Sequence, residues 1–186
     1  MVKLLIGDNM KKHILVVTII FISFLTVGCS MDMKKKAVEM YINEYQKLEK
    51  NVNYFGENSE KITKKQKEEY IELVKKQYQN MSYKIINIED TDDNAKAYLE
   101  VEIYDYKSSM DNSKKYYKDN PEKFTKDGNY DEEKYENYKL KELKKVQDRK
   151  KIYITLNLYK VNDKWYVEDL NNEDLLKITD LSEENV

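Results

Sequence analysis

The sequence predicts an α+β domain, because two amphipathic helical segments precede segments that alternate like strands. Between residues 38 and 52, and again between 70 and 81, apolar residues recur every three or four positions, as on a helix that buries one face. From residue 83 onward, apolar and polar residues alternate instead, as along a half-buried strand. We therefore expect N-terminal helices packed on a curved antiparallel β-sheet, with a helical insertion between strands.

Each predicted helix has a distinct apolar stripe. The first stripe consists of Val38, Tyr41, Ile42, Tyr45, Leu48 and Val52. A loop with Gly56 follows, and Thr63 and Gln66 then have the spacing of a capping box, in which each side chain satisfies a free backbone N–H at a helix start. The second helix should run to about Asn80, and its stripe consists of Tyr70, Leu73, Val74, Tyr78 and Met81.

Two strands are expected next, joined by a turn. Residues 83–89 form the first strand, residues 90–94 the turn and residues 95–106 the second strand. One face of the second strand is apolar, with Ala97, Leu99, Val101 and Ile103. The opposite face carries Lys96, Tyr98, Glu100, Glu102 and Tyr104.

Residues 107–150 form a long insertion before the next strand. We expect a polar loop over residues 108–113, a break at Pro121 and a second loop at Gly128. Residues 131–148 then predict a helix, because acidic residues precede lysines in the order that the helix dipole favours. Its thin apolar face would consist of Tyr135, Tyr138, Leu143 and Val146.

The last predicted strands form a hairpin over residues 151–170. Its inward residues are Ile152, Ile154, Leu156 and Leu158. Residues 161–164 supply the turn, because Asn162 and Asp163 tolerate left-handed backbone, and Trp165 begins the returning strand. Residues 172–181 predict a short helix that is capped by Asn171 or Asn172.

The segment Asn162–Leu170 resembles the terminal strand of NTF2-like and cystatin-like domains of bacterial extracytoplasmic lipoproteins, in which a turn is followed by lysine, tryptophan, apolar and acidic residues. The order of helices and strands over residues 34–181 is similar to that class as well. The resemblance implies a single α+β domain, but domains of this type serve as enzymes, ligand carriers and assembly modules, so it does not specify a function.

The N-terminal residues predict export. Basic residues at positions 11–13 precede an apolar run over residues 14–27, which is shorter than the roughly 20 residues that span a bilayer. Leu25–Cys29 resembles the lipobox of bacterial lipoproteins, which implies cleavage before Cys29 and lipidation of its sulfur. The expected organisation is a signal peptide at 1–28, a lipidated linker at 29–33, one domain at 34–181 with its insertion at 107–150, and a tail at 182–186. Translation from Met10 and an uncleaved signal anchor are the alternatives.

Composition excludes several chemistries. The chain has one cysteine and one histidine, and lipidation of Cys29 together with removal of residues 1–28 would leave the domain with neither a free thiol nor an imidazole. Thiol and Ser–His–Asp catalysis and zinc sites of the Cys/His type are therefore not expected, and we expect no cofactor. Cleavage would also change the net charge from −2 to −4, because Lys3, Lys11, Lys12 and Asp8 are lost. Nucleic acid is therefore an unexpected partner.

Three polar patterns have ordinary structural explanations. Asp90, Asp92 and Asn94 have the first spacings of a calcium loop, but the required glycine and glutamate are replaced by Ala95 and Val101, so we interpret the segment as a turn. Glu100 and Glu102 would lie about 7 Å apart on one strand face, where a solvated position is favoured over glycosidic catalysis. The lysine-rich stretch 139–151 predicts a solvated helix face, although anionic lipid headgroups are an alternative partner.

The 17 tyrosines are the remaining candidates for binding. Tyrosine combines an apolar ring with a polar tip, so it suits protein interfaces and sugar stacking, but it also favours ordinary half-buried strands. For Trp165, core packing is favoured over a binding role. The candidate binding or interface residues are Tyr98, Tyr104, Tyr153, Tyr159, Trp165 and Tyr166.

We therefore expect a non-catalytic binding module anchored to the outer face of the bacterial cell membrane by lipid on Cys29. Its partner would be a protein, which includes a second copy in a homodimer, or a small ligand held between helices and sheet. The alternatives are a cell-wall hydrolase that uses carboxylates alone and an accessory subunit of a secretion, conjugation or sporulation apparatus.

Overall fold

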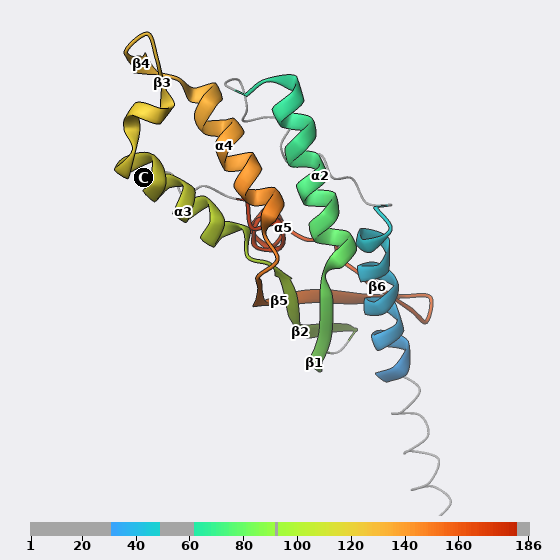
Figure 1. The fold of residues 1–186 in the computed structure, drawn as a ribbon. Helices are drawn as coiled ribbons and strands as arrows, with labels where there is room; N and C mark the ends of the chain where they lie inside the picture. The colour runs from blue at the N-terminus through green and yellow to red at the C-terminus, as the bar shows by residue number, and fades with distance from the viewer. Residues whose placement is uncertain (1–30, 49–61, 92, 182–186) are drawn as a thin grey trace, which may run out of the picture.

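The computed structural model describes residues 31–48, 62–91 and 93–181, and it has the α+β architecture that the sequence predicts. An antiparallel four-stranded sheet has the strand order β1-β2-β5-β6, and helices pack against it (Figure 1). The expected signal peptide, Cys29 and the tail at 182–186 lie outside the described residues. Residues 31–46 are helical, and the other elements are α2 (Lys64–Asn80), β1 (Ser82–Thr91), β2 (Asn94–Tyr104), α3 (Tyr106–Asp119), η2 (Pro121–Phe124), β3 (Thr125–Lys126), β4 (Asn129–Tyr130), α4 (Glu132–Lys145), β5 (Arg149–Val161), β6 (Lys164–Val167) and α5 (Asn172–Thr179).

The two predicted helical stripes are confirmed where the structure describes them. Val38, Tyr41, Ile42 and Tyr45 are buried, while Leu48 follows the helix with a φ of 61° and Val52 lies outside the described residues. The capping box of α2 is present in full, because Thr63 Oγ1 accepts from the Gln66 N–H and the Gln66 side chain accepts from the Thr63 N–H. All members of the second stripe are buried as predicted: Tyr70, Leu73, Val74, Tyr78 and Met81.

The inward face of the sheet and the helices share one core. β2 pairs with β1 on one side and with β5 on the other, and β5 pairs with β6 at the edge of the sheet. The inward residues of the two central strands are buried, namely Ala95, Ala97, Leu99, Val101, Ile103, Ile154, Leu156 and Leu158. A register shift between Ile85 and Asn87 leaves Ile86 unpaired and 53% exposed. Side chains of the 31–46 helix, α2 and α5 pack onto this face and form one hydrophobic core with it.

The expected polar loop over residues 108–113 is wrong, because these residues belong to α3. Asp105 lies between the last residue of β2 and the first residue of α3. Its side chain caps the helix by accepting a hydrogen bond from the Ser108 N–H at 3.2 Å. The buried residues Tyr106, Met110 and Ser113 give α3 an inward face that the serine-rich composition concealed. The same cap explains why β2 ends two residues earlier than predicted.

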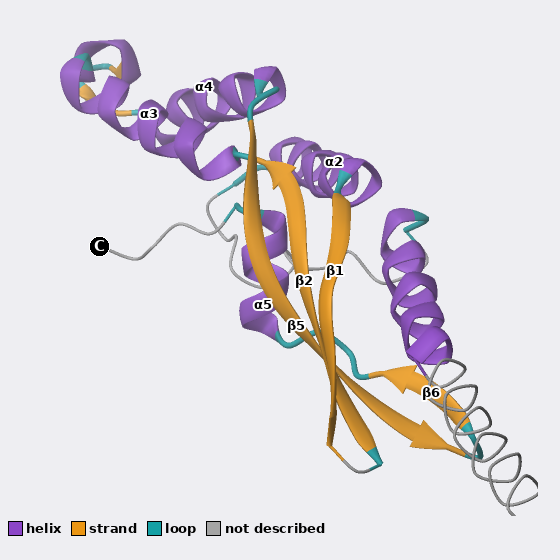
Figure 2. Cartoon of the chain, turned by 90° about the horizontal axis from the view of Figure 1, so that it is seen from below, coloured by secondary structure: helices purple, strands orange, loops and turns teal. Residues whose placement is uncertain are grey.

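The predicted helix after Gly128 is confirmed as α4, with Asp131 as its cap. Helices α3 and α4 project together from one end of the sheet and are joined by η2 and the β3–β4 hairpin (Figures 1 and 2). We refer to residues 106–145 as the arm. Its far end is held by an aromatic cluster that consists of Tyr116, Tyr117, Phe124, Tyr130, Tyr135 and Tyr138. The insertion therefore has a packed interior of its own.

The C-terminal hairpin and its turn are present as predicted, but the returning strand ends at Val167 and not at residue 170. Asn162 and Asp163 have φ angles of 49° and 61°, which is the left-handed backbone that a two-residue hairpin turn requires. β6 stops at Val167, and the chain then crosses to the 31–46 helix, where the Leu170 N–H donates to Tyr41 Oη at 2.8 Å. Asn171 caps α5. Within the described ranges, no helix has the length and hydropathy that crossing a bilayer would need.

Candidate functional site

All five candidate tyrosines lie on the outward face of the sheet, because side chains alternate faces along each strand. Tyr98 and Tyr104 alternate with buried residues of β2, and Tyr153 and Tyr159 alternate with buried residues of β5. Tyr166 on β6 lies directly opposite Tyr159. Tyr153 is 64% exposed, Tyr166 44% and Tyr159 37%, so three rings are open to solvent. We call Tyr98, Tyr153, Tyr159 and Tyr166 the outer tyrosine face.

The rings on this face are ordered by specific contacts. Tyr159 and Tyr166 lie directly opposite each other on β5 and β6, and their rings stack with centroids 5.7 Å apart. Tyr153 Oη donates to Glu100 at 3.2 Å, and Tyr98 Oη donates to Glu89 at 3.0 Å. The hydrogen bond to Glu89 raises the pKa of Tyr98 above its usual value. The outer tyrosine face therefore presents pre-positioned aromatic rings next to carboxylates.

Tyr104 lies at the opposite end of the sheet from Tyr159 and Tyr166. Tyr104 pairs with Arg149 at one end of the β2–β5 ladder, whereas Tyr159 pairs with Asn94 at the opposite end. The Tyr104 ring stacks on Tyr106 and lies 4.4 Å from Lys76 Nζ and 4.9 Å from the Arg149 guanidinium carbon. These contacts make Tyr104 a packing residue at the base of the arm.

Trp165 lies on the other side of the hairpin. Its half-buried ring packs against the core, with Lys34 Nζ 4.8 Å from the ring centroid. Lys34 is itself buried and pairs with Asp90. The Trp165 Nε1 atom is buried and has no hydrogen-bond partner among the described residues. The expected packing role therefore describes Trp165 better than a binding platform does.

Of the two glutamates on β2, Glu100 lies in an environment that favours its charged form. Lys151 Nζ lies 2.8 Å from Glu100 Oε1, and this hydrogen bond lowers the pKa of Glu100. Ser82 Oγ donates to Glu102 at 3.1 Å. A glycosidase general acid needs a raised pKa, so the geometry of Glu100 does not support the carboxylate-only hydrolase.

The remaining polar patterns behave as ordinary structure. Residue 92 of the 90–94 turn lies outside the described residues, and no group of three or more potential metal-ligating side chains occurs within the described part of the chain. In the 139–151 stretch, five lysines pair with acidic residues and Lys139 is buried, which the prediction of a solvated helix face did not anticipate. The pairs are Lys139–Glu136, Lys144–Glu69, Lys145–Glu142, Lys150–Asp180 and Lys151–Glu100.

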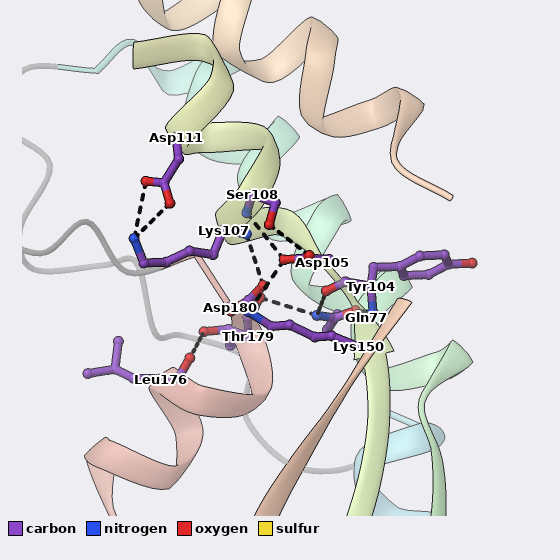
Figure 3. A network of polar contacts seen from close by, with 10 residues as sticks. All are labelled: Gln77, Tyr104, Asp105, Lys107, Ser108, Asp111, Lys150, Leu176, Thr179 and Asp180. Atoms are coloured by element: carbon purple, nitrogen blue, oxygen red, sulfur yellow. Dashed lines mark hydrogen bonds and ion pairs between the residues drawn. The ribbon is translucent and has the colours of Figure 1, made fainter. Parts of the chain in front are cut away.

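A buried polar network at the base of the arm was missed by the sequence analysis. Figure 3 shows side chains of α2, β5 and α5 converging on the junction of β2 and α3. Gln77, fully buried, donates to the Tyr104 carbonyl at 3.0 Å and accepts from its N–H at 2.9 Å. Asp180, in left-handed backbone after α5, accepts from the Lys107 N–H at 2.9 Å and lies 2.8 Å from Lys150 Nζ.

Burial raises the pKa of Asp180, while Lys150 and the Lys107 N–H oppose that rise. Asp105 also faces Lys150, at 3.4 Å. Because every one of these partners comes from a different element, the network fixes how the arm leaves the sheet. The local signal was Asp105 itself, because aspartate is one of the residue types that favour the N-cap position of a helix.

Comparison with known proteins found no match to a family model, to a curated protein or to a solved structure.

Proposed function

We propose that this chain is a lipid-anchored extracytoplasmic module, of the NTF2-like or cystatin-like type, that binds a protein partner through its outer tyrosine face and is not an enzyme. The observation that carries the proposal is the exposure of Tyr153, Tyr159 and Tyr166 on a sheet face that the described helices leave open. Tyrosine is enriched in the cores of protein interfaces, because a rigid ring buries a large area while its hydroxyl keeps a hydrogen bond.

The surroundings of these rings also support a protein partner. Exposed Ile86 on β1 and Val161 on β5 add apolar area. Glu100 and Lys151 form an ion pair beside Tyr153, which supplies polar groups for partner selection. The buried hydrophobic core between sheet and helices supports a contact on the outward face rather than a ligand enclosed between the layers.

In-cell crosslinking tests the interface. A photo-crosslinking side chain is placed at Tyr153 or Tyr166 of the whole chain, in the cells that produce it, and at the exposed control positions Lys65 and Lys118. We expect a protein adduct from the two tyrosine positions and none from the controls. An adduct of twice the chain mass would identify a second copy as the partner. Absence of any adduct at both tyrosine positions would overturn the proposed interface.

Anchoring through Cys29 is tested separately. The described helix already includes Met31, so lipid on Cys29 would hold the domain close to the bilayer. We expect the parent chain to incorporate a labelled fatty acid and the Cys29→Ser variant to incorporate none and to migrate as a longer precursor. Ser30→Ala is the control and should keep the label. Equal size and no label in parent and Cys29→Ser would instead indicate an uncleaved anchor.

A further inference from the structure

The helix over residues 31–46, blue in Figure 1, carries exposed methionine and lysine on the side away from the core. These residues recur every three or four positions, which places them on one face of the helix and of the turn that follows it. The exposed members are Met33, Lys36, Met40, Asn43 and Lys47. We call them the methionine–lysine stripe. Neither the core nor the outer tyrosine face uses it.

Exposed methionine is confined to this helix within the described residues. Met31, Met33 and Met40 are 43%, 45% and 58% exposed, whereas Met81 and Met110 are buried in the core. Methionine is flexible and apolar, so it adapts to irregular apolar surroundings. The 31–46 helix therefore presents apolar side chains both to the core and to the exterior.

The lysines of the stripe are available to an external anion. Lys36 and Lys47 are exposed, and neither forms an ion pair with an acidic residue in the described part of the chain. Asp32 and Glu39 lie along one edge of the stripe. Burial and the nearby charge of Glu39 raise the pKa of Tyr83, which places Glu39 toward β1. The stripe itself therefore carries positive charge without a carboxylate of its own.

The stripe begins close to the proposed lipid. Met31 follows Cys29 by two residues, so their Cα atoms are separated by at most about 7 Å of extended chain. Lipid on Cys29 would hold the first turn of the helix near the headgroups, and contact of the stripe with the bilayer then becomes intramolecular. Interfacial helices place apolar side chains at the headgroup boundary, while lysines attract anionic headgroups.

We propose that the methionine–lysine stripe docks on an anionic lipid bilayer, with Met33 and Met40 at the headgroup boundary and Lys36 and Lys47 on the headgroups. The proposal rests on the proposed anchoring through Cys29 and adds an orientation, because the 31–46 helix would lie along the bilayer. The opposite side of this helix packs onto the inward face of the sheet, so docking leaves the outer tyrosine face uncovered.

A nitroxide label at position 40 of the whole lipidated chain tests the docking. Lipidation consumes the thiol of Cys29, so Met40→Cys provides a unique labelling site, and Lys118→Cys on exposed α3 surface is the control. The chain is reconstituted into vesicles of phosphatidylglycerol and phosphatidylcholine in equal amounts. We expect the ratio of oxygen collisions to collisions with a water-soluble nickel complex to be several-fold higher at position 40 than at position 118.

Charge reversal tests the role of the lysines. Lys36→Glu combined with Lys47→Glu should return the label at position 40 to water, because anionic headgroups then repel the stripe. Lys65→Glu combined with Lys114→Glu is the matched control: it makes the same change in net charge at exposed positions of α2 and α3 and should leave the label buried.

The outcomes separate docking from anchoring. A chain that floats with the vesicles but leaves positions 40 and 118 equally accessible to the nickel complex overturns the docking and retains the anchor. A chain that does not float with the vesicles overturns both. Equal burial of the label on pure phosphatidylcholine, or in the Lys36→Glu and Lys47→Glu variant, would overturn the role of anionic headgroups. Dipolar broadening between labels would show that a second copy covers the stripe instead.

Discussion

Replacing Lys139 with methionine should destabilise the protein by about 3–5 kcal/mol, because it leaves Glu136 as an uncompensated charge in the interior. Lys139 and Glu136 are 4% and 8% exposed, and Lys139 Nζ lies 2.7 Å from Glu136 Oε1. Tyr70, on α2, donates to the other carboxylate oxygen at 2.9 Å. The hydrogen bond from Tyr70 therefore joins the arm to α2 through a carboxylate that Lys139 neutralises. Urea unfolding of the variant and the parent measures the loss of stability.

Two further variants show whether the unpaired charge is the cause. Glu136→Gln combined with Lys139→Met removes both charges and keeps an oxygen that can accept from Tyr70, so it should recover most of the lost stability. Lys141→Met, at an exposed position of the same helix, should change stability by less than about 0.5 kcal/mol. A double variant as unstable as Lys139→Met alone would contradict this account and would indicate that packing of the lysine stem is the dominant contribution.

The helices and strands were largely predictable because their signals are local. The capping box at Thr63, the left-handed turn residues Asn162 and Asp163, and the alternation along β2 each specify backbone geometry within a few residues. Helix α3 was not predictable from local signals, because its serine-rich and lysine-rich sequence is typical of a loop. Its inward face becomes visible only when Tyr106 and Met110 meet partners that come from other elements, and no local pattern contains that information.

The candidate site was predictable in part for the same reason. Period-two alternation places Tyr98, Tyr153 and Tyr159 on the outward face whatever the register. Register decides the rest: it stacks Tyr159 on Tyr166 and separates both from Tyr104 at the far end of the sheet. Lys139 was assigned to a solvated stretch because sequence shows the charge of a lysine but not the buried carboxylate that compensates it.

The protein should lose its fold cooperatively near pH 11, because several tyrosine hydroxyls are buried in the core. Tyr41, Tyr70, Tyr78 and Tyr106 are each at most 5% exposed, and burial raises the pKa of all four well above the usual value. The unfolded chain releases these protons from about pH 10 upward, whereas the folded chain retains them. Below pH 10 these tyrosines therefore do not reduce the free energy of unfolding. Above pH 10 the free energy of unfolding falls as the pH rises toward the folded-state pKa values.

The size of the loss follows from the same linkage. At pH 11 each tyrosine with an unfolded-state pKa near 10 favours unfolding by about 1.4 kcal/mol, so four together contribute about 6 kcal/mol, comparable to the whole stability of many domains. Far-ultraviolet circular dichroism and tyrosinate absorbance, followed in one pH titration, should show buried tyrosines ionising in the same narrow range in which the helices unfold.

Tyr78→Phe provides the sharpest check. The Tyr78 ring packs against Tyr45, and burial is the largest cause of its raised pKa, so phenylalanine keeps the packing and removes one ionisation. The variant should lose about 1.4 kcal/mol less between pH 9 and pH 11 than the parent does, as measured by urea unfolding at each pH. Broad ionisation of all tyrosines with helices intact would show that these hydroxyls reach solvent without unfolding, and the coupling of the tyrosine core to alkaline stability would then be wrong.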